Sequence, residues 1–420
     1  MKKLLLLSLF LSLVIAGHAQ VSQTVNVTAG GGLSAAITAA GGSLSTITNL
    51  TVTGTIDASD FVTLRDNMPA LTTLDISGAT IAAYTGTGGT YTDTSYPANT
   101  VPYDAFYNDA TGTGKTTLTS ITLPNSLTSI GNGAFELCTG LTSIPIPSSV
   151  TSIGSYAFNA CSGLTSATIP PLVTSIGVWA FAYCTSLTSI PIPSSVTSIG
   201  SYAFAYCSGL FTVDANNPNY SSNDGILFDK NQTTLIQFPT SKTGSYAIPS
   251  SVTSISDNAF GHCSGLTSIT IPSSVTFIGN YVFSGCTGLT SLYANATTPI
   301  DLSSSKIVFQ SVPTSTCILY VPSNSVTAYA NANQWSAFTH IVGFTATAVT
   351  TANTPTLKAF SQNGQLIVTG ISQGDMLTIY TVQGTTIYSQ RADGNQAVVN
   401  LPAQGIYIVK AGAQSVKVVN

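Results

Sequence analysis

The sequence predicts a β-rich solenoid of short parallel strands joined by helical or 3₁₀ arcs, followed by a small C-terminal β-sandwich. Two observations carry this prediction: a repeated phrase in the middle of the chain, and a change of pattern after residue 355. The phrase begins at six leucines, with a step of 23 residues inside each of its two runs: Leu118, Leu141, Leu164 and Leu187, then Leu266 and Leu289. A fixed period in the twenties is typical of a solenoid, because each unit is too small to fold alone.

Each copy of the phrase has three parts. The segment L-x-x-I-x-I-P predicts a short strand whose isoleucines point inward, and V-x-x-I-G predicts a second extended segment. The following x-A-F-x-x-C is expected to turn back as a short helical or 3₁₀ arc. Stacked coils pair such strands in parallel and align identical apolar residues in one core. We expect this repeat core to contain Phe135, Phe158, Phe181, Phe204, Phe260 and Phe283, with Cys138, Cys161, Cys184, Cys207, Cys263 and Cys286.

The repeated phrase resembles the leucine-rich repeat of the BspA-like bacterial surface proteins, a variant whose arc contains Ala-Phe-x-x-Cys. The resemblance covers roughly Leu118 to Leu292 and, with degenerate flanks, most of residues 44 to 343. It implies a leucine-rich-repeat fold and, for function, adhesion to host matrix, host cells or other bacteria. Because repeat folds host unrelated binding roles, the resemblance does not name the ligand.

Six of the seven cysteines occupy the same position of the repeat. One interpretation is a row of small, buried, unpaired side chains. The alternative is disulfide bonds between adjacent coils, because stacked strands approach within the Cα range that a disulfide needs. Cys317 lies outside the row and has no assigned partner.

The N-terminal third of the chain lies outside the regular repeats. Residues 1–19 begin with a charged pair, continue as an apolar run and end in small residues, which predicts a secretory signal peptide. Residues 20–117 are expected to form an irregular repeat or cap region, with strands at 50–56 and 71–76 and a helix through Arg65 that Asp57 or Ser59 caps. Residues 84–117, rich in Thr, Gly and Tyr, are expected to form a long loop.

The leucine-rich-repeat solenoid is expected to span residues 118–345. Pro145 and Pro191 occupy an outward strand position, so the strands there should be short or lose a hydrogen bond. The extra residues between the two runs predict an inserted β-hairpin near 211–245. A last strand at Cys317–Pro322 and a short helix from Ser325 to Phe338 are expected to close the C-terminal end.

The C-terminal 65 residues differ in pattern. Residues 346–355 read as a linker, and period-2 runs separated by glycine turns in 356–420 predict a small β-sandwich. Their order resembles the C-terminal sorting domain of the type IX secretion system of Bacteroidetes. The resemblance implies that the secretion machinery reads this tail as an address. The landmarks of the sorting tail are Gly384, Gly405, Tyr407, Lys410 and Lys417.

Composition and motifs argue against nucleic-acid binding and catalysis. Only 6% of residues are charged and the net charge is −4, whereas a phosphate-binding face needs clustered Lys and Arg. Asp109–Thr116 nearly spells a P-loop, but Asp109 replaces the first glycine and a strand follows. Gly370–Gly374 matches a nucleophile elbow without the required helix, and His262 is expected to be a surface residue. The Asn- and Asp-rich run 214–224 is better explained by turns than by calcium.

The most suggestive surface feature is aromatic. Aromatic residues stand two positions before the arc phenylalanine in several copies, where Gly133 and Asn258 stand in others. Consecutive coils are expected to place five rings side by side as a candidate binding surface: Tyr156, Trp179, Tyr202, Tyr183 and Tyr206. Aromatic rows bind proteins or stack on sugars, because flat rings bury area at low entropy cost. The alternatives are packing around the arcs, or binding by the Ser/Thr row on the repeat strands.

These observations predict an exported cell-surface or secreted protein that acts by binding, without an enzymatic centre, cofactor or metal. Its expected partners are proteins of the host matrix, the host cell or the bacterial surface. The alternative function is a glycan-binding module that uses the aromatic row. Apart from the signal peptide, no apolar run is long enough to cross a bilayer as a helix.

Overall fold

The structure, a computed structural model, describes residues 20–92, 95–344, 357–362, 365–371, 375–382, 385–394, 396–401, 405–411 and 414–419. The chain divides into two compact units between Phe344 and Thr345. The predicted signal peptide (1–19) and linker (346–355) lie outside the described residues.

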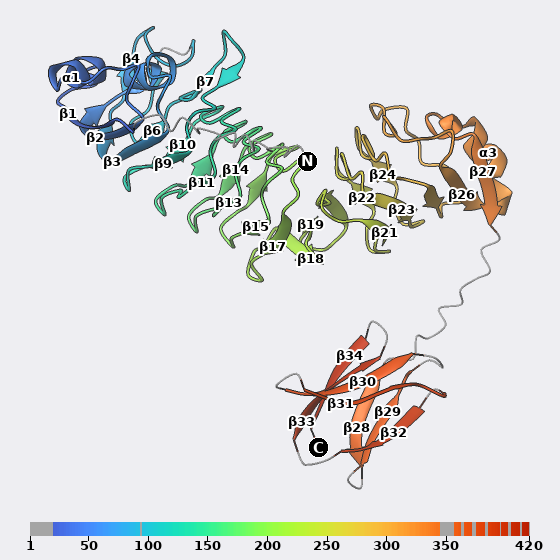
Figure 1. The fold of residues 1–420 in the computed structure, drawn as a ribbon. Helices are drawn as coiled ribbons and strands as arrows, with labels where there is room; N and C mark the ends of the chain where they lie inside the picture. Colours follow the sequence, from blue (N-terminus) through green and yellow to red (C-terminus); the bar gives the residue numbers. More distant parts are fainter. Residues whose placement is uncertain are drawn as a thin grey trace, which may run out of the picture. The chain divides into compact units, whose positions relative to one another are not determined.

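The first half of the first unit is a stack of coils with two parallel sheets (Figure 1). One sheet contains, in order, β1 (Ser22–Val27), β2 (Asn49–Ile56), β3 (Thr73–Ile81), β9 (Ser120–Thr122), β11 (Ser143–Ile144) and β13 (Ser166–Ala167). The other contains β6 (Thr100–Val101), β10 (Ser129–Ile130), β12 (Ser152–Ile153), β14 (Ser175–Ile176) and β16 (Ser198–Ile199). The pairing of Ser129 with Ser152 follows the 23-residue repeat. The predicted parallel-strand solenoid is therefore confirmed.

The second half resumes after an irregular coil. β15 (Ser189–Ile192) pairs with β17 (Leu210–Val213). The insertion contains the antiparallel strands β18 (Tyr220–Asn223), β19 (Ile226–Asp229) and β20 (Thr234–Gln237), and β20 continues in parallel to β22 (Ser254–Ile255) and β24 (Phe277–Ile278). The last sheet contains β21 (Gly244–Ala247), β23 (Leu266–Ile271), β25 (Ser291–Ala294), β26 (Ile318–Pro322) and β27 (His340–Phe344). The insertion thus returns its last strand to the stack.

The arcs are turns in the structure, so their expected helical or 3₁₀ form is wrong in the regular repeats. Their backbone N–H groups alternate between two acceptors. Phe135 N donates to Ala157 O of the next coil at 2.8 Å, whereas Glu136 N donates to Gly133 O within the arc at 3.0 Å. A helix would direct every N–H back along its own segment. Two residues of each arc also have positive φ, such as Trp179 (58°) and Tyr183 (58°), which breaks a helix.

The core behind the arcs is a row of stacked phenylalanines. All six predicted residues are at most 2% exposed, and Phe135 and Phe158 lie 5.3 Å apart at an interplanar angle of 3°. The six repeat cysteines are buried and free, as is Cys317. Their thiols donate to the phenylalanine carbonyl of the preceding coil, as in Cys184 Sγ to Phe158 O at 3.1 Å. The cysteine is therefore a small buried donor, and no adjacent-coil disulfide forms in the described residues.

The N-terminal end is covered by α1 (Leu33–Ala39), α2 (Ala58–Val62) and a π-helical turn (Thr63–Asn67). The predicted cap at Asp57 is confirmed, with Ser59 N donating to its carboxylate at 2.9 Å. The fully buried Asp60 completes this cap and also accepts from Gly31 N and Leu33 N, both at 2.8 Å. One carboxylate therefore joins the two short helices.

Residues 84–117 form structure where the sequence predicted a loop. They contain the antiparallel pairs β4 (Tyr84–Thr85) with β5 (Ser95–Tyr96) and β7 (Tyr107–Asn108) with β8 (Thr113–Gly114). β6 joins the repeat sheet, and Phe106 stacks on Phe135 at 5.2 Å. Lys115 stands three residues before Leu118, where the regular coils have cysteine, and its Nζ donates to Met68 O at 2.7 Å. This segment is a further coil that carries an insertion in its arc.

The prolines and the C-terminal end complete the first unit. β11 stops at Ile144, before Pro145, but β15 contains Pro191 and spans four residues, so proline alone does not shorten the strands. The predicted closing helix is found as α3 (Val326–Asn331), between the 3₁₀ turns Ser323–Ser325 and Trp335–Ala337. β26 was expected to be the last strand, but β27 follows it.

The second unit is built from antiparallel strands in two sheets. One contains β28 (Lys358–Gln362), β29 (Gln365–Thr369) and β32 (Gln396–Asn400); the other contains β31 (Thr386–Arg391), β30 (Met376–Thr381), β33 (Ile406–Ala411) and β34 (Gln414–Val419). Of the predicted sorting-tail residues, Gly384 lies outside the described residues. Gly405 is half-buried, Tyr407 is buried in the core, and Lys410 and Lys417 are exposed.

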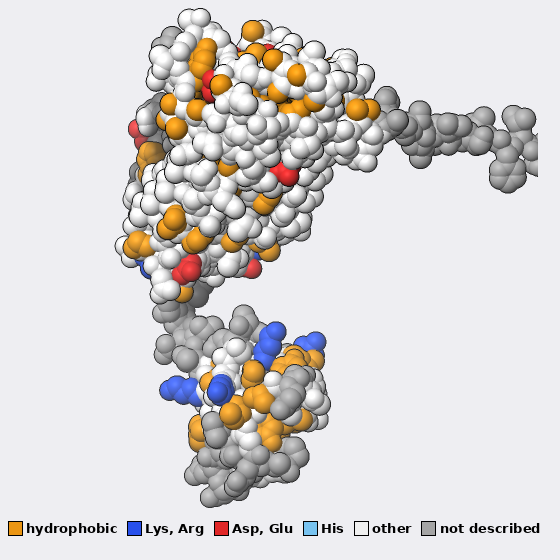
Figure 2. Space-filling view, turned by 90° about the vertical axis from the view of Figure 1, so that its left-hand side faces the viewer, with side chains coloured by type: hydrophobic (Ala, Val, Ile, Leu, Met, Phe, Trp, Pro, Cys, Tyr) orange, Lys and Arg blue, Asp and Glu red, His pale blue; other side chains and the backbone are white. Residues whose placement is uncertain are grey.

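Few charged side chains lie on the visible face of the first unit, where hydrophobic side chains are scattered among backbone and other uncharged side chains (Figure 2). Residues 20–344 contain five Lys and Arg against 13 Asp and Glu, a formal charge of −8. Within the described part of the chain, no helix is long and apolar enough to cross a membrane.

Candidate binding surface

The aromatic residues of the arcs share one backbone position. Tyr156, Trp179 and Tyr202 have φ of 59°, 58° and 59°, in the left-handed region that non-glycine residues rarely adopt. Asp104, Gly133, Asn258 and Tyr281 fill the same position in other coils, with φ between 52° and 60°. The repeat therefore fixes the backbone, and each coil chooses the side chain. Because asparagine and glycine suit this conformation better, the bulky rings are not there for the sake of the turn.

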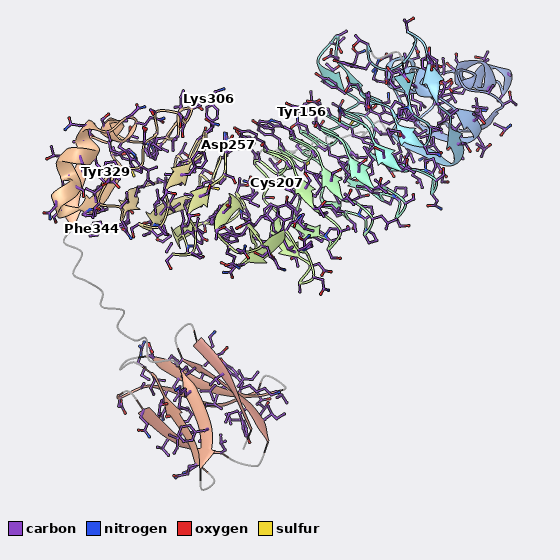
Figure 3. The ribbon with its side chains drawn as sticks, turned by 180° about the vertical axis from the view of Figure 1, so that it is seen from behind. Tyr156, Cys207, Asp257, Lys306, Tyr329 and Phe344 are labelled. Carbon is purple, nitrogen blue, oxygen red and sulfur yellow. The ribbon has the colours of Figure 1, made fainter. Side chains whose placement is uncertain are left out.

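The structure brings the five predicted aromatic residues together as one surface, here called the aromatic row. Trp179 stacks on Tyr202 at 4.7 Å and on Tyr156 at 6.4 Å, both at 7°. Tyr183 stacks on Tyr206 at 4.2 Å and lies 6.1 Å from Trp179. Tyr156 is 41% exposed and Tyr183 39%, whereas the other three are half-buried. Figure 3 shows that Tyr156 lies on the solenoid edge that also carries Asp257 and Lys306.

Ring stacking decides which part of each side chain is available. In the middle of the row, each ring covers the face of its neighbour, so a ligand meets ring edges and hydroxyl groups. Sugars stack on free aromatic faces, whereas protein interfaces bury rings from any side. The face of Tyr156 that points toward Gly133 is not covered by another ring of the row, because glycine has no side chain.

At its C-terminal end the aromatic row meets the insertion. Tyr202 Oη donates to Asp257 Oδ2 at 3.2 Å, and Tyr206 packs edge-on against the exposed His262 at 4.6 Å. Burial and the charge of Asp257 raise the pKa of Tyr202 to about 12, so its hydroxyl stays a donor at neutral pH. A cavity of about 410 Å³ lies beneath, lined by Tyr202, Tyr220 and polar residues of β20 and β22.

At the other end the aromatic row opens into a second cavity of about 510 Å³, here called the tyrosine pocket. Its lining contains four tyrosines, three carboxylates, one asparagine and one glycine: Tyr91, Tyr103, Tyr107, Tyr156, Asp104, Asp109, Glu136, Asn132 and Gly133. Only Tyr156 was predicted as a site residue. The sequence does hold a signal, because Asp104 stands two residues before Phe106, as Tyr156 stands before Phe158.

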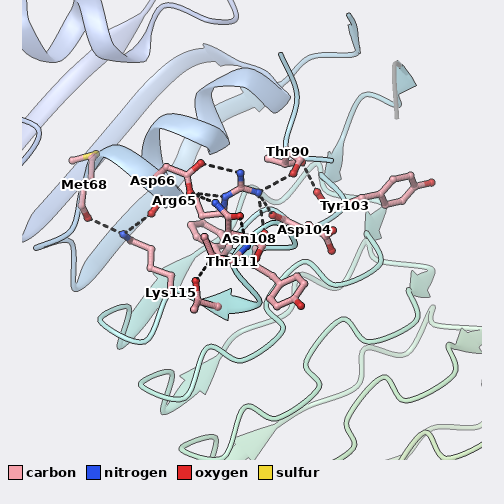
Figure 4. Close-up of polar contacts among 12 residues, drawn as sticks. Arg65, Asp66, Met68, Thr90, Tyr103, Asp104, Asn108, Thr111 and Lys115 are labelled. Atoms are coloured by element: carbon pink, nitrogen blue, oxygen red, sulfur yellow. Dashed lines mark hydrogen bonds and ion pairs between the residues drawn. The ribbon is translucent and has the colours of Figure 1, made fainter. Parts of the chain in front are cut away.

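A largely buried arginine, with 10% of its side chain exposed, holds the walls of the tyrosine pocket (Figure 4). Arg65 Nη1 donates to the carbonyls of Thr90, Asp104 and Tyr107 at 2.8, 3.0 and 2.9 Å. Its Nε and Nη2 form a bidentate pair with Asp66, both at 2.9 Å. Thr90 Oγ1 donates to the carbonyl of Tyr103. The charge of Arg65 is thus matched by Asp66, and its donors fix backbone rather than the carboxylates of the pocket.

The carboxylates of the tyrosine pocket are held close together. Burial, with the charges of Glu136 and Asp109, raises the pKa of Asp104 to about 7. Burial also raises the pKa of Glu136, against a hydrogen bond from Asn159 Nδ2 to its Oε1 at 2.9 Å. Lys115 forms no ion pair with them, because its Nζ donates to the carbonyls of Arg65 and Met68.

The other candidates that the sequence offered can now be placed by what surrounds them in the fold. Lys115, the lysine of the P-loop-like run, is a buried structural donor, which agrees with its rejection as a phosphate site. The Ser/Thr row is exposed along the repeat strands: Ser120, Thr122, Ser143, Ser166, Thr168 and Ser189. It presents hydroxyl groups without a cavity of the kind found at the two ends of the aromatic row.

Comparison with protein families assigns the repeats. The model of the BspA type leucine-rich repeat region, in six copies, matches residues 99–234 and 236–326, more than half of the chain. The chain is a BspA-type leucine-rich-repeat protein. The match begins at residue 99, inside the segment predicted to be a loop, and agrees with the coil built from β6 and Phe106.

Solved structures of several bacterial proteins are similar to this BspA-type chain. A leucine-rich cell surface protein from Faecalibacterium prausnitzii is 25% identical, with a TM-score of 0.43, over 69% of this chain and 82% of that one. A leucine-rich-repeat protein from Eubacterium ventriosum is 23% identical, with a TM-score of 0.41, over 65% and 73%. The pneumococcal vaccine antigen PcpA is 16% identical, with a TM-score of 0.39, over 78% and 90%. A search of curated proteins found no match.

Proposed function

We propose that this BspA-type protein is exported and acts at the cell surface or outside the cell by binding other proteins through the aromatic row. The observation that carries the proposal is the row itself: five rings gathered on consecutive coils, in a backbone position that favours glycine and asparagine. Clustered tyrosine and tryptophan are the side chains that contribute most to protein interfaces. A solenoid offers such a row without other machinery, because each repeat adds one position.

The glycan alternative is weaker on the same geometry. Tyr183 and Tyr206 stack at 4.2 Å and Trp179 and Tyr202 at 4.7 Å, so these ring faces are not free for a pyranose. The expected partners are therefore proteins of the host matrix, the host cell or another bacterium. An enzymatic role is not proposed, because among the residues that line the two described cavities no serine or cysteine is paired with a histidine.

The route of export forms part of the proposal. Residues 1–19 would direct secretion, and residues 356–420 would be read by a type IX secretion machinery as a sorting domain after the linker at 346–355. The antiparallel strands of the second unit and its exposed Lys410 and Lys417 support this assignment. Deleting residues 357–420 in the native host and locating the protein by fractionation tests it. Unchanged surface delivery would contradict the sorting role.

The binding proposal is tested with the full chain from Gln20 to Asn420 on a panel of matrix proteins, mucins, bacterial surface extracts and polysaccharides at physiological salt. We expect saturable binding to a protein. Saturable binding to polysaccharides alone would support the glycan alternative. Absence of binding to every member would contradict a role in adhesion.

A further inference from the structure

The tyrosine pocket lies where the aromatic row lacks one ring. Its position in the row is held by Gly133 (φ 60°), between Asp104 (φ 52°) on one side and Tyr156 (φ 59°) on the other. Neighbouring coils are about 4.8 Å apart, so the flanking residues are separated by about two coil steps. The Asp104 carboxylate lies where a side chain on Gly133 would begin, so a flat group that enters beside this carboxylate would stack on Tyr156, as Trp179 does from the other side at 6.4 Å. The space in the tyrosine pocket beside Tyr156 therefore fits a planar group.

The charged groups that line the tyrosine pocket favour a cation as its ligand. Asp104, Asp109 and Glu136 line the pocket, and its remaining walls are tyrosines, one asparagine and one glycine. Asp104 is only 9% exposed, its carboxylate lies against Gly133, and none of the hydrogen bonds found among the described residues ends on that carboxylate. A buried carboxylate without a partner is costly, so it marks a place that an incoming donor would satisfy. The formal charge of −8 over residues 20–344 draws cations toward this unit.

The kind of cation follows from the donors and the walls. No group of three His, Cys, Asp or Glu among the described residues is arranged to hold a metal ion. Phosphate and other anions are repelled by the three carboxylates. A guanidinium group is planar, stacks on aromatic faces and donates to two carboxylates at once, whereas an ammonium is a compact, strongly hydrated point charge.

We propose that the tyrosine pocket binds the guanidinium group of an arginine side chain on a protein partner, stacked on Tyr156 and hydrogen-bonded to Asp104 and Glu136. The cavity of about 510 Å³ is large enough for such a side chain. A partner that covers the adjacent aromatic row would bring its arginine to this end of it. That the arginine belongs to a protein partner rests on the proposed protein-binding function. Binding of a guanidinium group by the pocket itself is tested without a partner.

The probe is a blocked tripeptide with arginine at its centre, compared with the same peptide carrying lysine or the uncharged isostere citrulline. Binding to the chain from Gln20 to Asn420 is followed by saturation-transfer NMR and titration calorimetry. The charge variants are Asp104→Asn and Glu136→Gln, which keep shape, and Tyr156→Asn removes the stacking wall. Asn258 shows that asparagine fits this backbone position. Asp301→Asn, at a carboxylate outside both cavities, is the matched control.

We expect the arginine peptide to bind more tightly than the lysine peptide and the citrulline peptide not to bind. Asp104→Asn, Glu136→Gln and Tyr156→Asn should each weaken arginine binding at least tenfold, and Asp301→Asn should not change it. Equal binding of arginine and citrulline, or of arginine and lysine, would overturn the proposal. So would binding of monosaccharides without binding of arginine, or no binding of the arginine peptide to the folded wild-type chain.

A pH titration adds a readout that a purely structural role would not move. Asp104 is faced by Glu136, Asp109 and Tyr107 and, from the helical turn behind it, by Arg65. With its pKa near 7, Asp104 is mostly neutral at pH 6 and mostly charged at pH 8. Arginine binding should therefore strengthen by up to about tenfold across this interval, and this dependence should vanish in Asp104→Asn. If no protein of the panel binds but the arginine peptide does, the proposed function is contradicted and the proposed arginine site in the tyrosine pocket still stands.

Discussion

Replacing Trp179 by asparagine separates a binding role of the aromatic row from a packing role. Trp179 is the ring on which the row converges, because it lies 4.7 Å from Tyr202, 6.1 Å from Tyr183 and 6.4 Å from both Tyr156 and Tyr206. Asparagine is a better replacement than alanine, because Asn258 occupies the same position with a φ of 56°. The substitution removes the ring and leaves the arc backbone in a conformation that asparagine tolerates.

The cost to stability follows from these contacts. Each aromatic pair contributes about 0.5–1.5 kcal/mol beyond burial, and only the Tyr202 pair is close, so the lost stacking amounts to about 1–3 kcal/mol. Relief of the left-handed backbone returns about 1 kcal/mol, because asparagine tolerates that conformation better than tryptophan does. The net loss of about 0–2 kcal/mol is local and leaves the phenylalanine core beneath intact. The variant should therefore fold, with a slightly lower melting temperature.

The cost to binding should be larger. A central tryptophan of a protein interface contributes about 2 kcal/mol or more, which corresponds to roughly a 30-fold rise in Kd. The assay is surface plasmon resonance with the partner found in the panel, with circular dichroism melting as the folding check. Tyr281→Asn is the matched control, since Tyr281 has a φ of 54° in the same repeat position but lies outside the row. Equal affinity of the two folded variants would refute the reasoning.

Three further predictions concern the scaffold. The thiols should be unreactive toward Ellman's reagent in the native protein at pH 8, because burial raises the pKa of Cys138 and Cys207 to about 12. All seven thiols should react after denaturation. Fewer than seven reactive thiols in the unfolded protein would reveal disulfide bonds. Asp60→Ala should lower the free energy of unfolding by about 3 kcal/mol or more, since it leaves the buried N–H groups of Leu33 and Asp57 and the part-buried N–H group of Gly31 without an acceptor. Urea titration measures this, and a loss below about 1 kcal/mol would contradict it. The pKa of Asp104 in the folded state lies above its ordinary 3.8, so the folded state binds a proton that the unfolded state has lost between these pH values. The contribution of Asp104 to stability should therefore fall as pH rises from about 4 to about 7. The difference in melting temperature between wild type and Asp104→Asn should change over that interval and stay constant above it.

The repeat register could be predicted from the sequence because each inward position is chemically distinct. Ile121, Ile144 and Ile190 are buried where the period placed them, and the V-x-x-I-G segments form the second sheet. The position of each strand in a solenoid follows from the repeat spacing, which persists even where individual residues differ between copies. The fold class could therefore be predicted without knowledge of tertiary contacts.

The arc conformation could not be predicted, because it depends on hydrogen bonds between coils. Phe158 N bonds to Ala180 O of the next coil at 2.7 Å, and this pairing outweighs the helix preference of Ala-Phe sequences. Positive φ at Tyr156 and Ala160 also has no local signal, since neither residue type favours it. Hydrogen bonds from the neighbouring coils stabilise the arc conformation, and the sequence of one arc alone does not reveal them.

The coil formed by residues 99–117 was missed for a different reason. Phe106 and Phe135 are 29 residues apart, and Lys115 replaces the marker cysteine, so a search for the 23-residue period passes over it. The lysine fits because the neighbouring helical turn ends there and offers the carbonyls of Arg65 and Met68. In this coil a buried ammonium takes the place of a thiol and donates to two carbonyls, whereas the thiol of a regular coil donates to one.

The same comparison explains why the tyrosine pocket lies where it does. A regular coil stacks identical residues, so its surface is uniform along the axis and offers no depth. Depth arises where one coil omits a side chain that its neighbours keep, as Gly133 does between Asp104 and Tyr156, and where an insertion builds walls around the omission. Here the insertion is held by Arg65, whose donors fix the backbone of Thr90, Asp104 and Tyr107. Specificity in this fold is therefore expected at the irregular coils, and the regular ones supply the aromatic surface beside them.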